Sequence, residues 1–130
     1  MAKILIVEDQ ADIRKLIRMT LEFGNYEIHE AENGMEGWVR AQGLRPDLLL
    51  LDVMMPGELD GYQVCQKVKS DPLLSKTTAV VMLTARGQRT DLEHGNKAGA
   101  DAYLVKPFSP LELVDKVDEL LAARSAVRAA

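Results

Sequence analysis

The chain has 130 residues, of which 47% are hydrophobic and 28% charged, and its formal net charge is -4. These values fit one soluble globular domain and exclude a fibrous or disordered chain, while the negative charge argues against direct nucleic-acid binding, which needs a basic face. The single Cys65 excludes an internal disulfide, and the apolar run near the N-terminus is too short for a signal peptide or a membrane span. We therefore expect a cytoplasmic protein with no membrane segment.

The first predicted element is a buried strand over residues 3–7, because this run is apolar and rich in β-branched side chains. It ends in Glu8 and Asp9, so two acids follow the strand directly. From Ala11 the apolar residues recur at helical spacing, and Gly24 ends the pattern. This spacing predicts a first helix.

Residues 26–31 alternate between polar and apolar side chains, which predicts an edge strand. His29 falls on the polar side, where a surface role is expected rather than a ligand role. Asn33, with Glu36 three residues later, predicts the start of a second helix. The buried stripe of this helix is expected to contain Met35, Trp38 and Val39.

Four consecutive leucines at residues 48–51 predict a central parallel strand that is buried on both sides. The next residue, Asp52, carries a carboxylate that needs water, a proton or a cation. Ligands of open parallel sheets bind at the carboxyl ends of the strands, so Asp52 is a candidate site residue. On this stretch alone, an ordinary surface aspartate fits equally well.

Asp60 predicts the start of a third helix. Its buried side is expected to carry Tyr62, Cys65 and Val68. Residues 78–85 predict a fourth apolar strand, and residues 86–98 a helix. We expect this helix to be the least rigid one, because Gly87 and Gly95 each lower helix propensity by up to about 1 kcal/mol relative to alanine.

Residues 101–105 predict a fifth strand, and the combination of Ser109, Pro110 and Glu112 predicts the start of a last helix. The buried side of that helix is expected to carry Leu113, Val114, Val117, Leu120 and Leu121. Five strands thus alternate with five helices. Because crossovers between parallel strands are right-handed, this alternation predicts a doubly wound α/β fold with helices on both faces of the sheet.

Polar side chains leave four of the strands at their carboxyl ends. They are Glu8, Asp9, Asp52, Thr84 and Lys106. Three neighbouring carboxylates repel one another unless a cation is present, and such oxygen ligands suit Mg²⁺. An ammonium and a hydroxyl beside that ion can hold a phosphoryl group in transfer, with Asp52 as the nucleophile that forms an acyl phosphate. The alternative is a structural ion-pair network in which Lys106 neutralises Asp52.

Four spaced motifs, taken in order, resemble the receiver domain of two-component response regulators, including single-domain chemotaxis regulators. The motifs are Glu8-Asp9, Asp52 followed by Met55-Pro56, Thr84-Ala85, and Lys106-Pro107-Phe108. The resemblance covers residues 2–121. It implies a flavodoxin-like sheet of strand order 2-1-3-4-5, a receiver domain over residues 1–124 and a short C-terminal tail over residues 125–130.

The same resemblance implies a metal site and a phosphoacceptor. Asp52 would accept the phosphoryl group from a sensor histidine kinase or a histidine phosphotransfer protein. Mg²⁺ (or Mn²⁺) would be bound by Asp9, Asp52 and the backbone carbonyl of Met54, with Glu8 contributing through water.

The resemblance also implies a conformational switch. Thr84 and Lys106 would contact the phosphoryl oxygens, and the Lys106–Pro107 peptide bond is expected to be cis. Tyr103 would turn inward when Thr84 moves, altering the face formed by residues 86–98, the fifth strand and the last helix. This face would control the binding of a downstream protein that the sequence does not identify, and the chain would be a monomer or a phosphorylation-dependent dimer.

Two departures from the family pattern concern the surroundings of Asp52. Residues 57–59 make the following loop one residue longer than is usual, which predicts a bulge. Met54 and Arg86 occupy the positions two after Asp52 and Thr84, which influence the lifetime of the acyl phosphate. A bulky apolar group and a long cation can obstruct the attacking water, so slow self-dephosphorylation is predicted.

Three functions are compared with the motifs of the chain. The first is a signalling switch that catalyses only its own phosphorylation and dephosphorylation and, because the chain ends soon after the last helix, has no fused output domain. The second is a Mg²⁺-dependent small-molecule phosphatase or phosphotransferase, although Asp52-Val53-Met54 lacks the Asp-x-Asp pair of dehalogenase-like phosphatases and no cap insertion encloses a substrate. The third, a nucleotide-binding protein, fails because no glycine-rich phosphate loop follows any strand.

Overall fold

A five-stranded parallel sheet in the order β2-β1-β3-β4-β5 forms the centre of the computed structural model, which describes residues 1–85 and 99–129. The strands are β1 (Ala2–Val7), β2 (Tyr26–Ala31), β3 (Leu48–Asp52), β4 (Ala79–Ala85) and β5 (Ala102–Lys106). The doubly wound fold and the strand order are both as expected. β2 lies at an edge of the sheet. Its His29 is at the surface, with Nε2 2.9 Å from Oε2 of Glu27.

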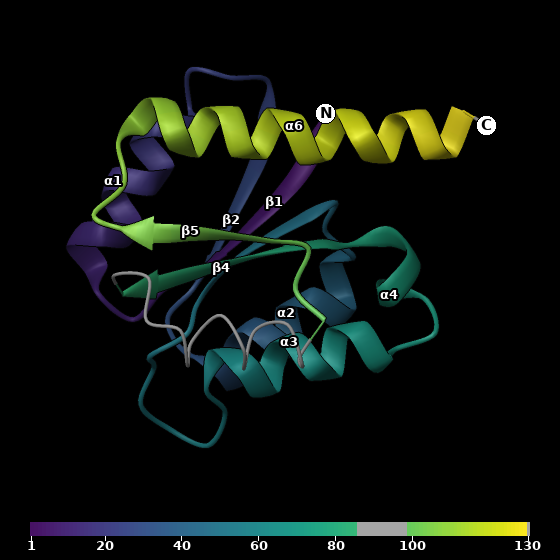
Figure 1. Cartoon of the computed structure of the whole chain (residues 1–130). Coiled ribbons are helices and arrows are strands. Elements are labelled where there is room, and N and C mark those ends of the chain that lie inside the picture. The colour runs from purple at the N-terminus through teal and green to yellow at the C-terminus, as the bar shows by residue number, and fades with distance from the viewer. Residues whose placement is uncertain (86–98, 130) are drawn as a thin grey trace.

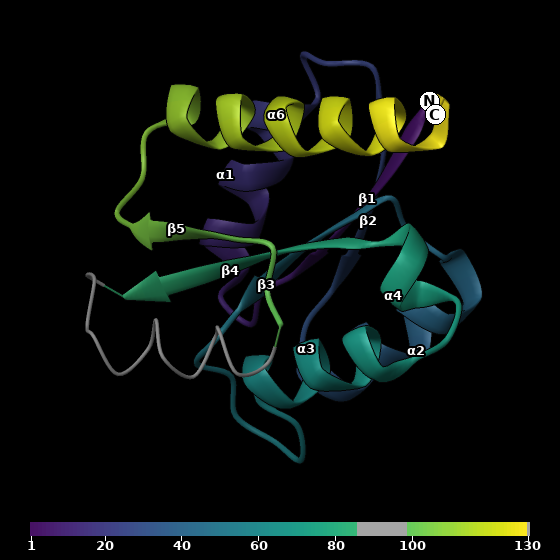
Figure 2. The same ribbon diagram turned by 45° about the vertical axis from the view of Figure 1, so that its right-hand side comes forward.

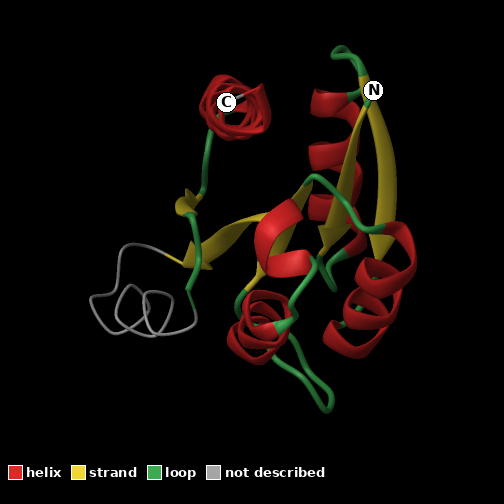
Figure 3. Cartoon of the chain, turned by 90° about the vertical axis from the view of Figure 1, so that its right-hand side faces the viewer, coloured by secondary structure: helices red, strands yellow, loops and turns green. Residues whose placement is uncertain are grey.

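Helices cover both faces of the sheet, as Figures 1 and 3 show. The described helices are α1 (Ala11–Leu21), α2 (Gly34–Leu44), α3 (Gly61–Ser70), α4 (Leu74–Thr77) and α6 (Pro110–Ala129). α1 and α6 lie on one face, and α2, α3 and α4 lie on the other. None of these helices is long and apolar enough to cross a membrane.

Two features of the helices differ from the sequence prediction or extend beyond it. The short α4 was not predicted; the Asp71 side chain caps it by accepting hydrogen bonds from the backbone N–H groups of Leu73 and Leu74, both at 2.9 Å. α6 continues to Ala129, through most of the segment expected to form a tail. The helix expected over residues 86–98 lies outside the described residues.

The core consists of two layers, because successive strand residues point to opposite faces. In β3, Leu49 and Leu51 pack toward α2 and α3, whereas Leu48 and Leu50 pack toward α1 and α6. All four leucines are fully buried, and β3 lies between β1 and β4. The predicted central strand is therefore confirmed, and its last residue, Asp52, is held by rigid packing on both sides.

Local capping signals predicted three helix starts correctly. Asn33 Oδ1 accepts a hydrogen bond at 2.8 Å from the backbone N–H three residues later. Asp60 and Gln63 form a reciprocal capping box at the start of α3. Ser109 and Glu112 do the same at the start of α6. These caps satisfy backbone donors that a helix leaves unpaired at its N-terminus.

The predicted buried stripe of α2 is wrong for two of its three residues. Met35 and Val39 are 41% and 59% exposed, and only Trp38 packs against the core. The reason is that α2 approaches the sheet through its small residues: a Cβ at Gly37 would lie 2.8 Å from a methyl group of Val7. This close approach turns the larger apolar side chains outward.

Candidate functional site

The carboxyl ends of the strands meet at one edge of the sheet, on the side where β4 and β5 end in Figure 2. Asp52 and Lys106 are the last residues of β3 and β5, while Glu8 and Asp9 follow β1 directly. Thr84 lies in β4, one residue beyond the partner of Asp52 in the strand pairing. The structure thus gathers the five polar residues that the sequence singled out.

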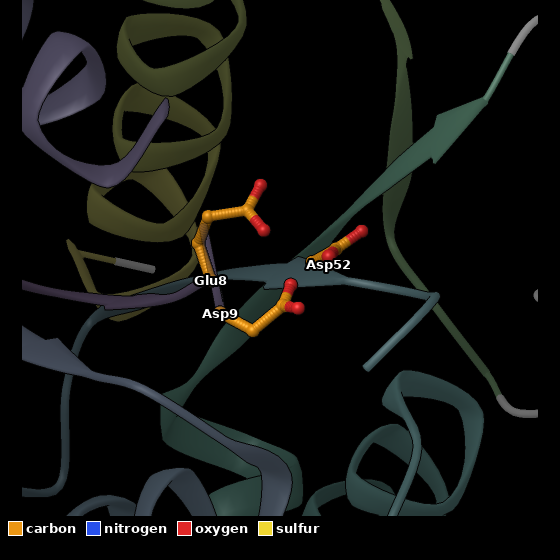
Figure 4. A group of neighbouring side chains, drawn as sticks. All are labelled: Glu8, Asp9 and Asp52. Atoms are coloured by element: carbon orange, nitrogen blue, oxygen red, sulfur yellow. The ribbon is translucent and has the colours of Figure 1, made fainter. Parts of the chain in front are cut away.

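Three carboxylates converge at this edge from two neighbouring strands, as Figure 4 shows. Glu8, Asp9 and Asp52 each offer an oxygen that lies within 4.8 Å of the other two. Glu8 is fully buried and Asp52 is 4% exposed. Lys106 Nζ lies 2.8 Å from Glu8 Oε1 and 3.2 Å from Asp52 Oδ1. The cluster therefore contains three carboxylates, and one ammonium contacts two of them, so the excess of negative oxygen ligands fits a divalent cation.

The pKa shifts at the site reflect this imbalance of charge. Burial, helped by a hydrogen bond to Asp52, raises the pKa of Glu8 to about 7 in spite of the opposing effect of Lys106. For Lys106, burial acts to lower the pKa, but the hydrogen bond to Glu8 and the charges of Asp52 and Glu8 outweigh it and raise the pKa. The lysine is therefore charged at neutral pH, whereas Glu8 retains a proton part of the time when no cation is bound.

Thr84 supplies the site with a buried hydroxyl. Its side chain is fully buried, and Thr84 Oγ1 is a buried polar atom that finds no hydrogen-bond partner among the described residues. Buried polar groups normally have partners, because an unmade hydrogen bond costs about 1–3 kcal/mol. A hydroxyl in this state is available to a ligand oxygen at the edge of the sheet.

The backbone around Asp52 is closely packed. The Met54 backbone N–H donates to Asp52 Oδ1 at 3.3 Å, while the Met54 side chain is 71% exposed. A Cβ at Gly61 would lie 2.2 Å from the Asp52 carbonyl oxygen, so α3 begins directly against the end of β3. The Lys106–Pro107 peptide bond is cis, as expected.

Other residues named from the sequence lie elsewhere. Tyr103 lies in β5 and is half-buried against the core layer of α2 and α3, where burial raises the pKa of its hydroxyl. Arg86 lies outside the described residues.

Arg14 belongs to the site and was missed. Its guanidinium donates to the Glu8 backbone carbonyl at 2.8 Å and to Glu30 Oε1 at 3.1 Å, and its side chain is only 13% exposed. It thereby fixes the turn that carries Glu8 and Asp9. In the sequence Arg14 is one of several polar residues of α1, and the pairing of β1 with β2 brings Glu30 to it.

Fold and site together define a doubly wound α/β protein with an acidic cluster and a lysine at the carboxyl edge of its sheet. A sequence model described as "Response regulator receiver domain" matches residues 4–118. The chain therefore belongs to the family of response regulator receiver domains.

Similar proteins agree with this assignment. The chain is 49% identical over 119 residues to the transcriptional regulatory protein ResD of Bacillus subtilis, covering 92% of this chain and 48% of that protein. It is 46% identical over 119 residues to the transcriptional regulatory protein SrrA of Staphylococcus aureus, covering 92% and 47%. The chain thus spans about half the length of these curated relatives.

Solved structures show the same relationship. A putative response regulator from Chloroflexus aurantiacus superposes with a TM-score of 0.87 at 37% identity, covering 93% of this chain and 98% of that one. The chemotaxis response regulator CheY4 of Vibrio cholerae gives a TM-score of 0.85 at 32% identity, covering 92% and 98%. The chain is a receiver domain, the signalling-switch module of two-component systems. The small-molecule phosphatase alternative finds no support in these similarities.

Proposed function

We propose that Asp52 accepts a phosphoryl group from the phosphohistidine of a sensor histidine kinase or a histidine phosphotransfer protein in the cytoplasm. The observation that carries this proposal is the placement of Asp52: nearly buried at the end of the central strand, 3.2 Å from Lys106 and within 4.8 Å of the oxygens of Glu8 and Asp9. In the transfer, an Asp52 carboxylate oxygen bonds to phosphorus as the phosphorus–nitrogen bond breaks. The electron pair stays on the imidazole of the donor, which takes up a proton.

The residues that would hold Mg²⁺ (or Mn²⁺) are Asp9, Asp52 and the Met54 backbone carbonyl, with Glu8 acting through water. The fit rests on the carboxylate cluster, which offers hard oxygen ligands and carries more negative charge than Lys106 neutralises. When bound, the ion supplies positive charge that lowers the repulsion between the carboxylates and an incoming phosphoryl group. Val7 and Leu51, near the carboxyl ends of β1 and β3, are fully buried, and this packing would hold Glu8 and Asp52 in place before an ion binds.

Lys106 and Thr84 would receive the phosphoryl oxygens. In the transfer, Lys106 can exchange its contact with Asp52 Oδ1 for a phosphoryl oxygen while keeping Glu8, and its raised pKa keeps it charged for that role. The Thr84 hydroxyl, which has no hydrogen-bond partner within residues 1–85 and 99–129, can donate a hydrogen bond to a second oxygen. Both groups stabilise negative charge on the transferred group.

The output of this switch would be a change in protein contacts. Movement of Thr84 toward the phosphoryl group would leave space that Tyr103 enters, altering the surface of β5 and α6. A downstream protein, a second copy of the chain or a further domain would respond to that surface. Because ResD and SrrA are named transcriptional regulatory proteins, control of transcription is the first output to test.

Incubation with acetyl phosphate and Mg²⁺, followed by intact mass measurement, tests the proposal against the enzyme alternative. A single phosphoryl adduct that persists in the wild type and is absent in Asp52→Ala is expected. Continuous release of phosphate over many turnovers without an adduct would instead indicate a phosphatase.

Slow loss of the phosphoryl group is a further part of the proposal. Met54 and Arg86 are proposed to obstruct the attacking water, so Met54→Asn and Arg86→Ala should each shorten the half-life of the adduct. Phosphate release from the purified phosphorylated protein measures this half-life. Half-lives equal to that of the wild type would contradict the assignment of these two residues.

A further inference from the structure

Glu8 and Asp9 follow β1 directly, and one peptide group joins them (Figure 4). The backbone N–H of Glu8 still belongs to the sheet, because it donates to the Ala31 carbonyl at 3.2 Å. The carbonyl of Glu8 instead accepts a hydrogen bond from Arg14 Nη1 at 2.8 Å. Because a peptide group is planar, a donor that fixes this carbonyl also fixes how the two side chains on either side of it are oriented.

Arg14 is itself held by the neighbouring strand. Its Nε donates to Glu30 Oε1 at 3.1 Å, and the second carboxylate oxygen of Glu30 lies 2.6 Å from Arg18 Nη1. Glu30 lies in β2, which pairs with β1. The guanidinium is planar and carries its donors in a fixed geometry, so the bond from Nε to Glu30 restricts where Nη1 can point. A carboxylate on β2 thus helps to hold the peptide group at the end of β1.

Arg14 forms no ion pair with the carboxylate cluster within the described part of the chain. Its ion pairs are with Glu30 and Glu32, at 3.1 and 3.8 Å. Lys106, in contrast, contacts the carboxylate of Glu8 directly. As a charge alone, Arg14 would repel a cation bound at the cluster, whereas its hold on the backbone would favour binding. The two effects have opposite signs, so an experiment can tell them apart.

We propose that Arg14 is a positioning residue for the metal site: together with Glu30, it holds the Glu8–Asp9 peptide group in the orientation in which both carboxylates reach the same ion. This inference rests on the proposed function, which assigns Asp9 and, through water, Glu8 to the ion. It adds a cation of α1 and an acid of β2 that are not themselves ligands.

The expected effect of Arg14→Met follows from the lost hydrogen bond. Methionine keeps a long side chain but has no donor for the Glu8 carbonyl, so the peptide group can rotate and displace the Asp9 carboxylate. Mg²⁺ tolerates little departure from octahedral geometry, and loss of a group that orients metal ligands typically weakens binding 10–100-fold. We expect the Mg²⁺ dissociation constant to rise about tenfold. If Arg14 acted only through its charge, this constant would fall instead.

A second variant tests the part played by Glu30. Glu30→Met removes the anchor of Arg14 and should also raise the Mg²⁺ dissociation constant, but less than Arg14→Met does, because the donor to the Glu8 carbonyl remains. The double variant should bind Mg²⁺ no more weakly than Arg14→Met, since both changes act through one hydrogen bond. If only charge mattered, the two changes would cancel, and the double variant would bind Mg²⁺ as the wild type does.

Two control variants separate this effect from changes in net charge and in stability. Arg40→Met removes the same charge from a surface pair on α2, where Arg40 Nε lies 3.2 Å from Glu36 Oε1, and should not weaken Mg²⁺ binding. Ile17→Val removes one buried methyl group from the same helix as Arg14 and should lower stability without weakening Mg²⁺ binding.

Isothermal titration of the metal-free full chain with Mg²⁺, at a temperature where circular dichroism shows each variant folded, is the test. The backbone amide signal of Asp9 without metal is a second readout, because its N–H lies in the same peptide group as the Glu8 carbonyl. Arg14→Met should move this signal, and Arg40→Met should not. If Arg14→Met does not fold, Arg14→Lys carries the test, because it keeps the charge and loses the planar donor geometry.

Three results would overturn the inference. They are a Mg²⁺ dissociation constant within twofold of the wild type or below it in the folded Arg14 variant, an equal loss of affinity in Arg40→Met or Ile17→Val, and wild-type affinity in the double variant. Absence of Mg²⁺ binding in the wild type would instead overturn the proposed metal site.

Discussion

Replacing Lys106 with methionine should destabilise the fold in a way that Mg²⁺ repairs. The substitution keeps a side chain of similar length and removes the ammonium that lies 2.8 Å from the fully buried Glu8 and 3.2 Å from Asp52. Removing one partner of a buried ion pair costs about 3–5 kcal/mol. Because the pKa of Glu8 is already raised to about 7, a proton can replace part of the lost charge, and we expect a loss of about 2–3 kcal/mol at pH 7.

Urea unfolding of Lys106→Met and wild type, in EDTA and in saturating Mg²⁺, measures this loss. The ion supplies positive charge to the same oxygens, so the difference between the two proteins should shrink when Mg²⁺ is present. Lys116→Met is the matched control: Lys116 Nζ lies 3.6 Å from the exposed Glu119, and its loss should cost less than about 0.5 kcal/mol. An equal loss with and without Mg²⁺, or no loss at all in EDTA, would contradict the proposed balance of charge between Lys106 and the ion.

Three other predictions concern burial, close packing and a polar contact elsewhere in the fold. Burial raises the pKa of Cys65 to about 11 from 9.0, so at pH 8 the folded chain should react with a thiol reagent about 100-fold more slowly than the urea-unfolded chain. Because the unfolded thiol loses its proton first, stability should fall as pH rises from 9 to 11, and this slope should be smaller in Cys65→Ala. Gly61→Ala should cost at least about 2 kcal/mol in urea unfolding, because its Cβ would overlap the Asp52 carbonyl. Asp101→Asn should cost about 1–2 kcal/mol, because it weakens the contacts with Lys69 and the Val80 backbone N–H. An unchanged urea unfolding midpoint in Gly61→Ala or in Asp101→Asn would contradict the estimate for that variant.

The site was predictable from sequence because it depends on a rule of topology. Polar residues that end parallel strands meet at one edge of the sheet whatever the order of the strands, so Asp52, Thr84 and Lys106 could be grouped before the sheet was known. Capping residues such as Asp60 act within three positions and were predictable for the same local reason. The strand order itself came from the family resemblance, because alternation of strands and helices does not determine it.

The features that the sequence did not predict correctly depend on contacts between distant segments of the chain. Met35 and Val39 match helical periodicity, but periodicity does not reveal that Gly37 lets α2 approach Val7 closely and turn them outward. The contact of Arg14 with the Glu8 carbonyl is local, but its ion pair with Glu30 forms because β2 lies beside β1. The close contact between Gly34, at the start of α2, and the Leu59 backbone likewise depends on the packing of two elements, and no local sequence pattern indicates it.

The most direct test of the central claim is the location of the phosphoryl group in the phosphorylated chain. After reaction with acetyl phosphate and Mg²⁺, proteolysis and fragment mass spectrometry identify the modified residue. We expect one phosphoryl group on the fragment that contains Asp52, formed only when the divalent cation is present. A phosphoryl group on Glu8 or Asp9, or equal labelling of Asp52→Asn and wild type, would contradict it.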